Sequence, residues 1–181
     1  MNYANQLTIA RLIAVVPVMA ALYVQFPGNR AAATVLYAAA ILTDYLDGIM
    51  ARRSGKVTAF GKLMDSIADK ALIVSLFFAL VAEGSMPAWM AAIMVVREFA
   101  VTGLRMVALE SGEVIAANRW GKAKMVSQSL AVFILLLGYA SLGYWTMLVA
   151  TVLTLLSGWS YLKDTPRILA SSSAEQDKDR S

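Results

Sequence analysis

The sequence predicts an all-α integral membrane bundle of six transmembrane helices. Of its 181 residues, 59% are hydrophobic, which leaves too little polar surface for a water-soluble domain of this size. The apolar residues also gather in six stretches of roughly 18 to 22 residues, each near the length that a helix needs to cross a bilayer. We place these spans near residues 7–26, 31–51, 64–82, 87–108, 125–142 and 144–162.

The connections between the spans predict the orientation of the chain. Three breaks carry turn-forming residues, at 27–29, 83–87 and 141–143, and Arg30 is the exception in loops that otherwise lack positive charge. The other basic residues near the spans lie on the opposite side, at Arg52, Arg53, Lys56, Lys62, Arg119, Lys122, Lys124, Lys163 and Arg167. By the positive-inside rule, we expect a multi-pass protein of the cytoplasmic membrane with both termini in the cytoplasm.

The two ends of the chain complete the expected domain organisation. The first apolar stretch lacks a basic leader and a small-residue cleavage site, so we expect no cleavable signal peptide. We assign residues 1–170 to one membrane domain. Residues 171–181 are rich in Ser, Asp and Lys, which predicts a disordered cytoplasmic tail.

The composition excludes several kinds of chemistry. The chain has no Cys and no His, so disulfides, thiolate metal sites and imidazole bases are absent, and acid-base work falls to carboxylates, Lys or Tyr. The formal net charge is +4, but the basic residues are spread over short loops rather than gathered in a patch. We therefore expect no nucleic-acid partner.

Four aspartates, Asp44, Asp47, Asp65 and Asp69, lie in or beside apolar segments, where carboxylates are costly and usually functional. Their spacings of three and four residues put each pair on one helix face, and the expected topology brings both pairs to a similar depth. Four like charges would repel each other unless cations lie among them. All-oxygen ligands favour Mg²⁺ or Mn²⁺, so the sequence predicts a site for a pair of divalent metal ions.

These aspartates belong to a longer pattern, Asp44-x2-Asp47-Gly48-x2-Ala51-Arg52-x8-Gly61-x3-Asp65-x3-Asp69. It resembles the signature of the CDP-alcohol phosphatidyltransferase family in every fixed position. The resemblance implies that the four aspartates hold two divalent metal ions and that Asp69 also acts as general base. It further implies contacts with a CDP-linked lipid at Asn5, Thr8, Gly48, Arg52, Thr58 and Gly61.

The rest of the chain points to the acceptor. The start from Asn5 to Arg11, the pair Arg97-Glu98, Arg105 and residues 121–128 are similar to bacterial phosphatidylglycerophosphate synthases. This resemblance implies a homodimer that transfers the phosphatidyl group of CDP-diacylglycerol to glycerol 3-phosphate, giving phosphatidylglycerophosphate and CMP. A dianionic acceptor needs cations, and the candidates are Arg97, Arg105, Lys122 and Lys124.

Several alternatives remain open at this stage. The same chemistry could use another acceptor, as in cardiolipin, phosphatidylserine or phosphatidylinositol phosphate synthesis, and intramembrane carboxylates could instead line the path of a cation transporter. Gly48 and Gly61 could serve helix packing. The cations could form structural ion pairs, at Lys70, Arg97 and Arg105, or basic flanks of a span, at Lys122 and Lys124.

Overall fold

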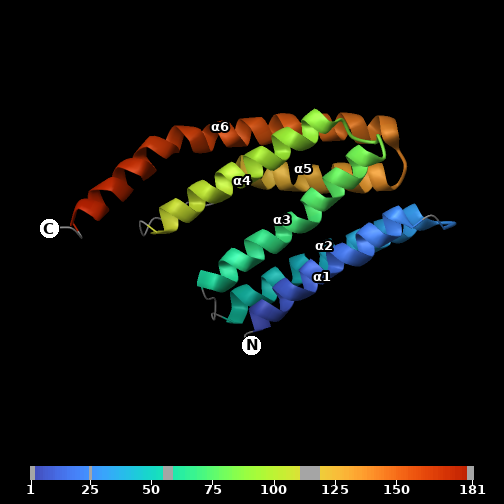
Figure 1. Cartoon of the computed structure of the whole chain (residues 1–181), viewed down its shortest axis with the longest axis horizontal. Helices are drawn as coiled ribbons and strands as arrows, with labels where there is room; N and C mark the ends of the chain where they lie inside the picture. Colours follow the sequence, from blue (N-terminus) through green and yellow to red (C-terminus); the bar gives the residue numbers. More distant parts are fainter. Residues whose placement is uncertain (1–2, 25, 55–58, 111–118, 179–181) are drawn as a thin grey trace.

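The computed structural model is all-helical over the residues it describes, which are 3–24, 26–54, 59–110 and 119–178. Side chains are described for residues 13–24, 26–43, 70–108 and 120–159. These parts of the chain contain six helices and no strand (Figure 1). The helices are α1 (Tyr3–Tyr23), α2 (Asn29–Ser54), α3 (Ala59–Ala82), α4 (Ala88–Glu110), α5 (Arg119–Leu136) and α6 (Ala140–Lys178).

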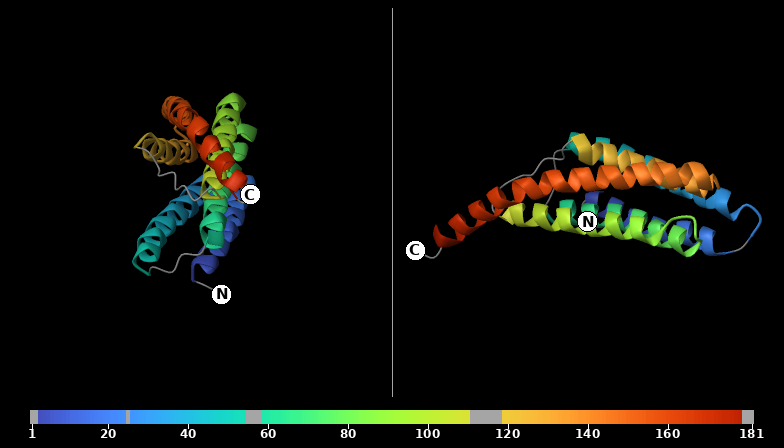
Figure 2. Two further views of the ribbon diagram at one scale, coloured as in Figure 1. Left: turned by 90° about the vertical axis from the view of Figure 1, so that its left-hand side faces the viewer. Right: turned by 90° about the horizontal axis from the view of Figure 1, so that it is seen from above.

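The helices form two groups of three. In the first group α1 packs against both α2 and α3, and in the second group α6 packs against both α4 and α5. All six run roughly along one long axis (Figure 2). Contacts of α3 with α4 and α5, and of α2 with α5, join the groups along a seam. Residues from α3 to α6 can therefore meet at this seam.

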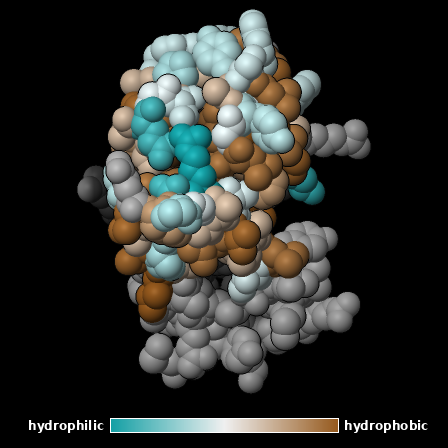
Figure 3. All heavy atoms as spheres, turned by 90° about the vertical axis from the view of Figure 1, so that its right-hand side faces the viewer, coloured by the Kyte–Doolittle hydropathy of each residue, from teal (hydrophilic) through white to brown (hydrophobic). Residues whose placement is uncertain are grey.

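Two of the three expected breaks are confirmed. Gly28 has a φ of 84°, and the side chain of Asn29 accepts a hydrogen bond from the backbone N of Arg30 at 2.8 Å, which gives a partner to one N–H group in the first turn of α2. Gly84, in the turn after α3, has a φ of 73°. Arg30 Nη2 and Glu83 Oε2 form an ion pair at 2.9 Å that ties these two turns together. Seen from this end, the hydrophilic surface is a small patch among hydrophobic residues (Figure 3).

The expected break at 141–143 is wrong. The turn between α5 and α6 lies at Gly138, whose φ of 87° is a conformation that residues with a Cβ rarely adopt. Gly143 lies inside α6, where its backbone packs directly against the side chain of Leu135 on α5. Two glycines five residues apart are both compatible with a turn in the sequence, and only the packing of α5 on α6 distinguishes them.

The core contains apolar side chains from all six helices. Leu76, Phe77 and Leu80 of α3 occupy its centre, together with Met90 and Met94 of α4. Apolar side chains also cover much of the outside, including Val96 and Phe99 of α4 and Trp145 and Trp159 of α6. The interior is therefore packed in the usual way, while the described surface is far more apolar than that of a typical soluble monomer.

Length and hydropathy identify one described segment, Ala140–Trp159 in α6, as long and apolar enough to cross a membrane. Two shorter apolar segments, Ile13–Tyr23 and Lys70–Ala82, border residues whose side chains the structure does not describe. Beyond its apolar part, α6 continues as a helix to Lys178. It thus enters the stretch assigned to a tail, and the division of the chain at residue 170 stays a prediction.

The close approach of α5 and α6 can be tested at Gly143. A methyl group here would overlap Cγ and Cδ2 of Leu135, a side chain that is only 2% exposed, so Gly143→Ala must shift Leu135 or separate the helices. We expect a loss of about 1 to 3 kcal/mol in stability, as for other overpacked cores. The measurement is thermal unfolding in detergent.

Gly103→Ala is the matched control. Gly103 lies in the interior of α4, and no heavy atom beyond its own helix backbone and chain neighbours comes within 4 Å of a Cβ there. The better helix propensity of alanine should leave stability unchanged or slightly raised. Equal behaviour of the two variants would contradict the tight contact at Gly143.

Candidate functional site

The expected acidic residues lie at matching positions on two consecutive helices. Asp44 and Asp47 precede the end of α2 at Ser54 by ten and seven residues, and Asp65 and Asp69 follow the start of α3 at Ala59 by six and ten. At a rise of 1.5 Å per residue, both pairs lie about 9 to 15 Å from these helix ends. Four residues separate the two helices, and both ends lie at the same end of the bundle (Figure 1). This backbone arrangement agrees with the expected common depth.

The side chains of the four aspartates lie outside the described residues. No three acidic side chains come together among those that are described. The donor set itself consists of four carboxylates, and hard oxygen donors of this kind suit Mg²⁺ or Mn²⁺. The residues present therefore fit a divalent metal site in their chemistry.

Most of the residues expected to bind the CDP-lipid are also described by their backbone alone. The structure describes the helical backbone, but not the side chains, of Asn5 and Thr8 in α1, Gly48 and Arg52 in α2, and Gly61 in α3. Thr58 lies outside the described residues altogether. The N-terminal end of α1 lies beside the end of α2 and the start of α3 (Figure 1). The backbone thus places these five residues at the same end of the bundle as the aspartates.

Four charged side chains and one hydroxyl group meet at the seam, and we call them the Glu98 cluster: Lys70, Arg97, Glu98, Lys124 and Ser157. The carboxylate of Glu98 on α4 pairs with Lys70 Nζ of α3, 3.8 Å from Oε1, and with Arg97 Nη1, 3.6 Å from Oε2. Lys124 of α5 binds the same Oε2. Arg97 Nη2 also donates a hydrogen bond to Ser157 Oγ of α6. Three helices from both groups therefore meet at one carboxylate, and Arg97 links α6 to them.

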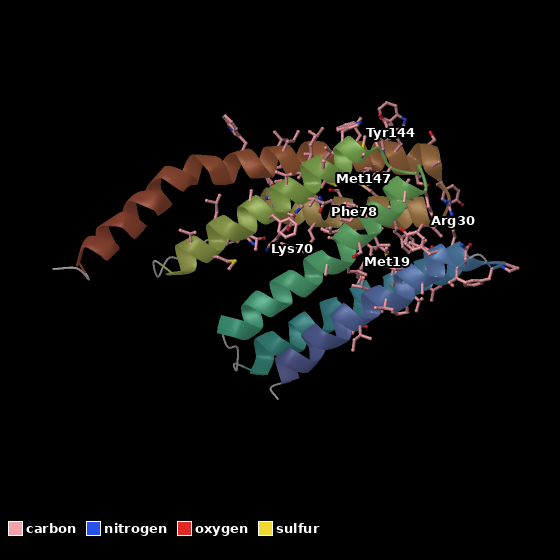
Figure 4. All side chains as sticks on the ribbon, viewed as in Figure 1. Met19, Arg30, Lys70, Phe78, Tyr144 and Met147 are labelled. Atoms are coloured by element: carbon pink, nitrogen blue, oxygen red, sulfur yellow. The ribbon has the colours of Figure 1, made fainter. Side chains whose placement is uncertain are left out.

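These charged side chains lie largely inside the protein. Their exposed fractions are 5% for Lys124, 11% for Arg97, 13% for Lys70 and 20% for Glu98. Lys70 lies on the side of α3 that faces α4 (Figure 4). Among the described side chains, three cations lie around this one carboxylate. Interactions between charges in such a buried place are only weakly screened by solvent and salt.

A second polar contact extends the cluster between α5 and α6. Gln128, one turn after Lys124, donates a hydrogen bond from Nε2 to Thr154 Oγ1 at 3.2 Å. Gln128, Thr154 and Ser157 are all buried. A polar strip therefore runs along the contact between these two helices and holds them in register.

The four cations expected to bind the acceptor phosphate have different surroundings in the structure. Arg97 and Lys124 come together at Glu98, and the burial of Lys124 argues against a simple basic flank. Arg105 is half-buried and lies seven residues after Glu98, on the same face of α4. Lys122 is exposed, as expected of a basic flank. The functional roles of these four residues stay predictions.

Sequence reasoning did not include three neighbours of this site among the functional residues. Lys70 was considered only as a structural partner, although it follows Asp69 directly and a lysine inside an apolar stretch is costly. That signal could have identified it. Ser157 and Gly158 carry no such signal. Their closeness to Arg97, whose Cγ would lie 3.2 Å from a Cβ at residue 158, follows only from the packing of α4 on α6.

Comparison with known proteins identifies relatives of similar length. The chain is 38% identical over 183 aligned residues to the CDP-diacylglycerol--glycerol-3-phosphate 3-phosphatidyltransferase of Bacillus subtilis, with 88% of this chain and 93% of the relative covered. A protein of the same name from Rickettsia bellii is 33% identical, with 90% and 94% covered. A probable phosphatidylglycerophosphate synthase of Mycobacterium tuberculosis is 36% identical, with 89% and 80% covered.

The profile of one protein family also matches most of the chain. It describes CDP-alcohol phosphatidyltransferases and matches residues 1–156, a range that contains the acidic pattern on α2 and α3 and most of the Glu98 cluster. Together with the similarity to the three relatives over nearly the full chain, this match shows that the chain belongs to the CDP-alcohol phosphatidyltransferase family.

Proposed function

We propose that this enzyme transfers the phosphatidyl group of CDP-diacylglycerol to glycerol 3-phosphate, forming phosphatidylglycerophosphate and releasing CMP. Membership of the family supports the phosphatidyl transfer. The names of the relatives in Bacillus subtilis and Rickettsia bellii support both substrates. The observation that carries the choice of acceptor is the Glu98 cluster, because it gathers three cations in one place and cations bind a phosphorylated acceptor through charge-assisted hydrogen bonds.

The position of the cluster supports a place for the acceptor beside the acidic residues. Lys70 directly follows Asp69 on α3, and its side chain is at the seam with α4 and α5. An acceptor whose phosphate is bound by Arg97, Arg105 and Lys124 would have its hydroxyl group near the acidic end of α3. Lys122 would add positive charge at the exposed entrance. This arrangement brings the hydroxyl group of the acceptor to the proposed general base, Asp69, while the phosphate group of the acceptor stays away from that carboxylate.

The donor would bind at the other part of the site. Asp44, Asp47, Asp65 and Asp69 would hold two divalent metal ions, either Mg²⁺ or Mn²⁺, which supply neutralisation of the charge on the donor's pyrophosphate. Divalent-metal dependence is general in the family. Arg52 would bind a donor phosphate, and Asn5, Thr8, Gly48, Thr58 and Gly61 would shape the pocket for the rest of the CDP group.

Different residues of the chain then have different roles in the transfer reaction. The carboxylate of Asp69 accepts the proton of the acceptor hydroxyl group, whose oxygen attacks the phosphorus that carries the lipid. The bond from this phosphorus to the CMP oxygen breaks, and CMP leaves. Arg97, Arg105 and Lys124 keep the acceptor oriented during the attack, which removes much of the entropic barrier.

We further propose that the six helices form a transmembrane bundle in the cytoplasmic membrane, with both termini in the cytoplasm. The family is membrane-associated, and α6 contains a segment suited to cross a bilayer. The exposed apolar side chains of α4 and α6 would contact lipid or the second subunit of a homodimer. The basic residues at the ends of the helices would lie on the cytoplasmic side, where the polar acceptor arrives.

The proposed acceptor can be tested by measuring CMP release from CDP-diacylglycerol with different acceptors. Glycerol 3-phosphate should exceed glycerol, serine and myo-inositol, because only a phosphorylated acceptor uses the charge-assisted hydrogen bonds, worth about 1.5 to 3 kcal/mol each. Arg105→Gln should raise KM for glycerol 3-phosphate about tenfold or more and leave KM for the donor nearly unchanged. A preference for phosphatidylglycerol or inositol phosphate would contradict the proposed acceptor, and no CMP release with any acceptor would favour a transporter.

Metal dependence gives a second test. CMP release should stop in excess chelator and return with Mg²⁺ or Mn²⁺, and Asp44→Asn or Asp47→Asn should raise the metal concentration required and lower the maximal rate. The measurement is a metal titration of each purified variant. Full turnover in chelator would contradict the proposed role of the aspartates.

A third test concerns the proton acceptor. Asp69→Asn should lower kcat by a factor of about 10² or more, because an amide cannot accept the proton of the hydroxyl group. Its helix content and thermal unfolding, measured by circular dichroism, should remain close to those of the wild type. Turnover near the wild-type level would remove Asp69 from this role.

A further inference from the structure

We infer that Glu98 is a positioning residue for acceptor recognition: its carboxylate gathers cations from three helices so that together they bind the acceptor's phosphate group. This inference rests on the proposed function and goes beyond it, because Glu98 is itself an anion and would not bind the phosphate. Its role would be to fix the places of Lys70, Arg97 and Lys124.

Each of the two carboxylate oxygens of Glu98 faces cations from a different group of helices. Oε1 faces Lys70, which belongs to α3 in the first group, at 3.8 Å. Oε2 faces Arg97 of α4 at 3.6 Å and binds Lys124 of α5, both in the second group. One side chain therefore links the helix that carries Asp65 and Asp69 to the helices that carry the acceptor cations.

Repulsion among the three cations explains why the cluster needs the carboxylate of Glu98. Three cations held so close in a largely buried site repel one another, and long flexible side chains such as Lys70 and Lys124 would turn away from each other. Glu98 lowers this repulsion because its carboxylate lies next to all three cations. Its presence allows the cations to stay together at the place where the acceptor's phosphate group would bind.

The packing around Arg97 limits its movement in the same way. A Cβ at Gly158 of α6 would lie 3.2 Å from Arg97 Cγ, so the absence of a side chain there lets the stem of Arg97 lie against the helix backbone. The guanidinium group then reaches Ser157 Oγ through Nη2 and Glu98 through Nη1. Arg97 is thus held by Ser157 and Glu98, and Glu98 also pairs with both lysines.

The opposite role for Glu98 makes a contrary prediction. If Glu98 only competed with the acceptor for the cations, its removal would raise the positive charge and tighten the binding of glycerol 3-phosphate. If Glu98 positions the cations, its removal disperses them and weakens binding. The direction of the change in KM therefore decides between the two roles.

The experiment compares Glu98→Gln with the wild type in the CMP-release assay. We expect KM for glycerol 3-phosphate to rise about 10- to 100-fold, the loss of one or more charge-assisted hydrogen bonds, while KM for CDP-diacylglycerol changes less than about twofold. The slow reaction with glycerol, which lacks a phosphate, should be unaffected. A lower KM for glycerol 3-phosphate, or an equal loss with glycerol, would overturn the inference.

Glu83→Gln is the matched control, since it makes the same chemical change in the ion pair with Arg30 at the opposite end of the bundle. Glu83 is 26% exposed and takes no part in the proposed site, so both KM values should stay at the wild-type level. A rise in KM for glycerol 3-phosphate in both variants would show a general loss of helix packing and overturn the specific role of Glu98.

A double-mutant cycle tests whether Glu98 acts through its neighbours. Lys124→Gln should raise KM for glycerol 3-phosphate, and adding Glu98→Gln should raise it much less than in the wild-type background. Effects that multiply independently would overturn the inference. If Glu98→Gln does not fold, Glu98→Asp decides: its shorter side chain should raise the same KM several-fold, and an unchanged KM would count against the inference.

The same assay separates this inference from the proposed function. Failure of the wild-type protein to release CMP with glycerol 3-phosphate would contradict the proposed function itself. Normal release by the wild type, combined with an unchanged KM in Glu98→Gln, would leave the proposed function standing and remove only the role of Glu98.

Discussion

The arrangement of the bundle depends on one constraint, which is that a charge inside apolar helices must be compensated. Glu98 meets it by pairing with Lys70 across the seam and with Arg97 and Lys124 on its own side. Removing one member of such a group leaves uncompensated charge in the interior, so the members fix one another's positions. The seam therefore combines these polar contacts with apolar packing, and the apolar contacts are less specific about register. The interaction that joins the two groups of helices also lies where the two substrates would meet.

Most of the fold could be predicted because its signals are local. Long apolar stretches and turn residues identify all six helices to within a few residues at most ends, and the turns at Gly28 and Gly84 lie where the sequence puts them. The error at the turn between α5 and α6 has a non-local cause. Gly138 and Gly143 look alike in sequence, but Gly143 is required by the nearby Leu135, and Gly138 by its backbone conformation. The helix α6 continues to Lys178 through residues of polar composition, and a separate tail at residues 171–181 stays a prediction.

The site shows the same division between local and non-local information. The acidic pattern is recognisable because carboxylates in apolar segments are rare and their spacing follows the helix period. Arg97 and Lys124 could be selected by charge alone, and the structure brings them together. The sequence could not distinguish Lys124, which is buried, from Lys122, which is exposed, because both precede the same apolar stretch. Ser157 and Gly158 belong to the site only because they contact the side chain of Arg97, which lies about sixty residues earlier in the chain. The sequence around these two residues does not indicate that contact.

Under the proposed function, the two groups of helices divide the two substrates between them. The first group carries the residues assigned to the donor, on α1, α2 and α3, and the second carries Arg97, Arg105 and Lys124. A change of acceptor would then require changes mainly in α4, α5 and α6, while the acidic pattern would stay intact. Lys70 is the exception, because it belongs to the first group but pairs with Glu98 of the second. Since it directly follows Asp69, its pairing ties the position of the proposed base to the position of the acceptor cations.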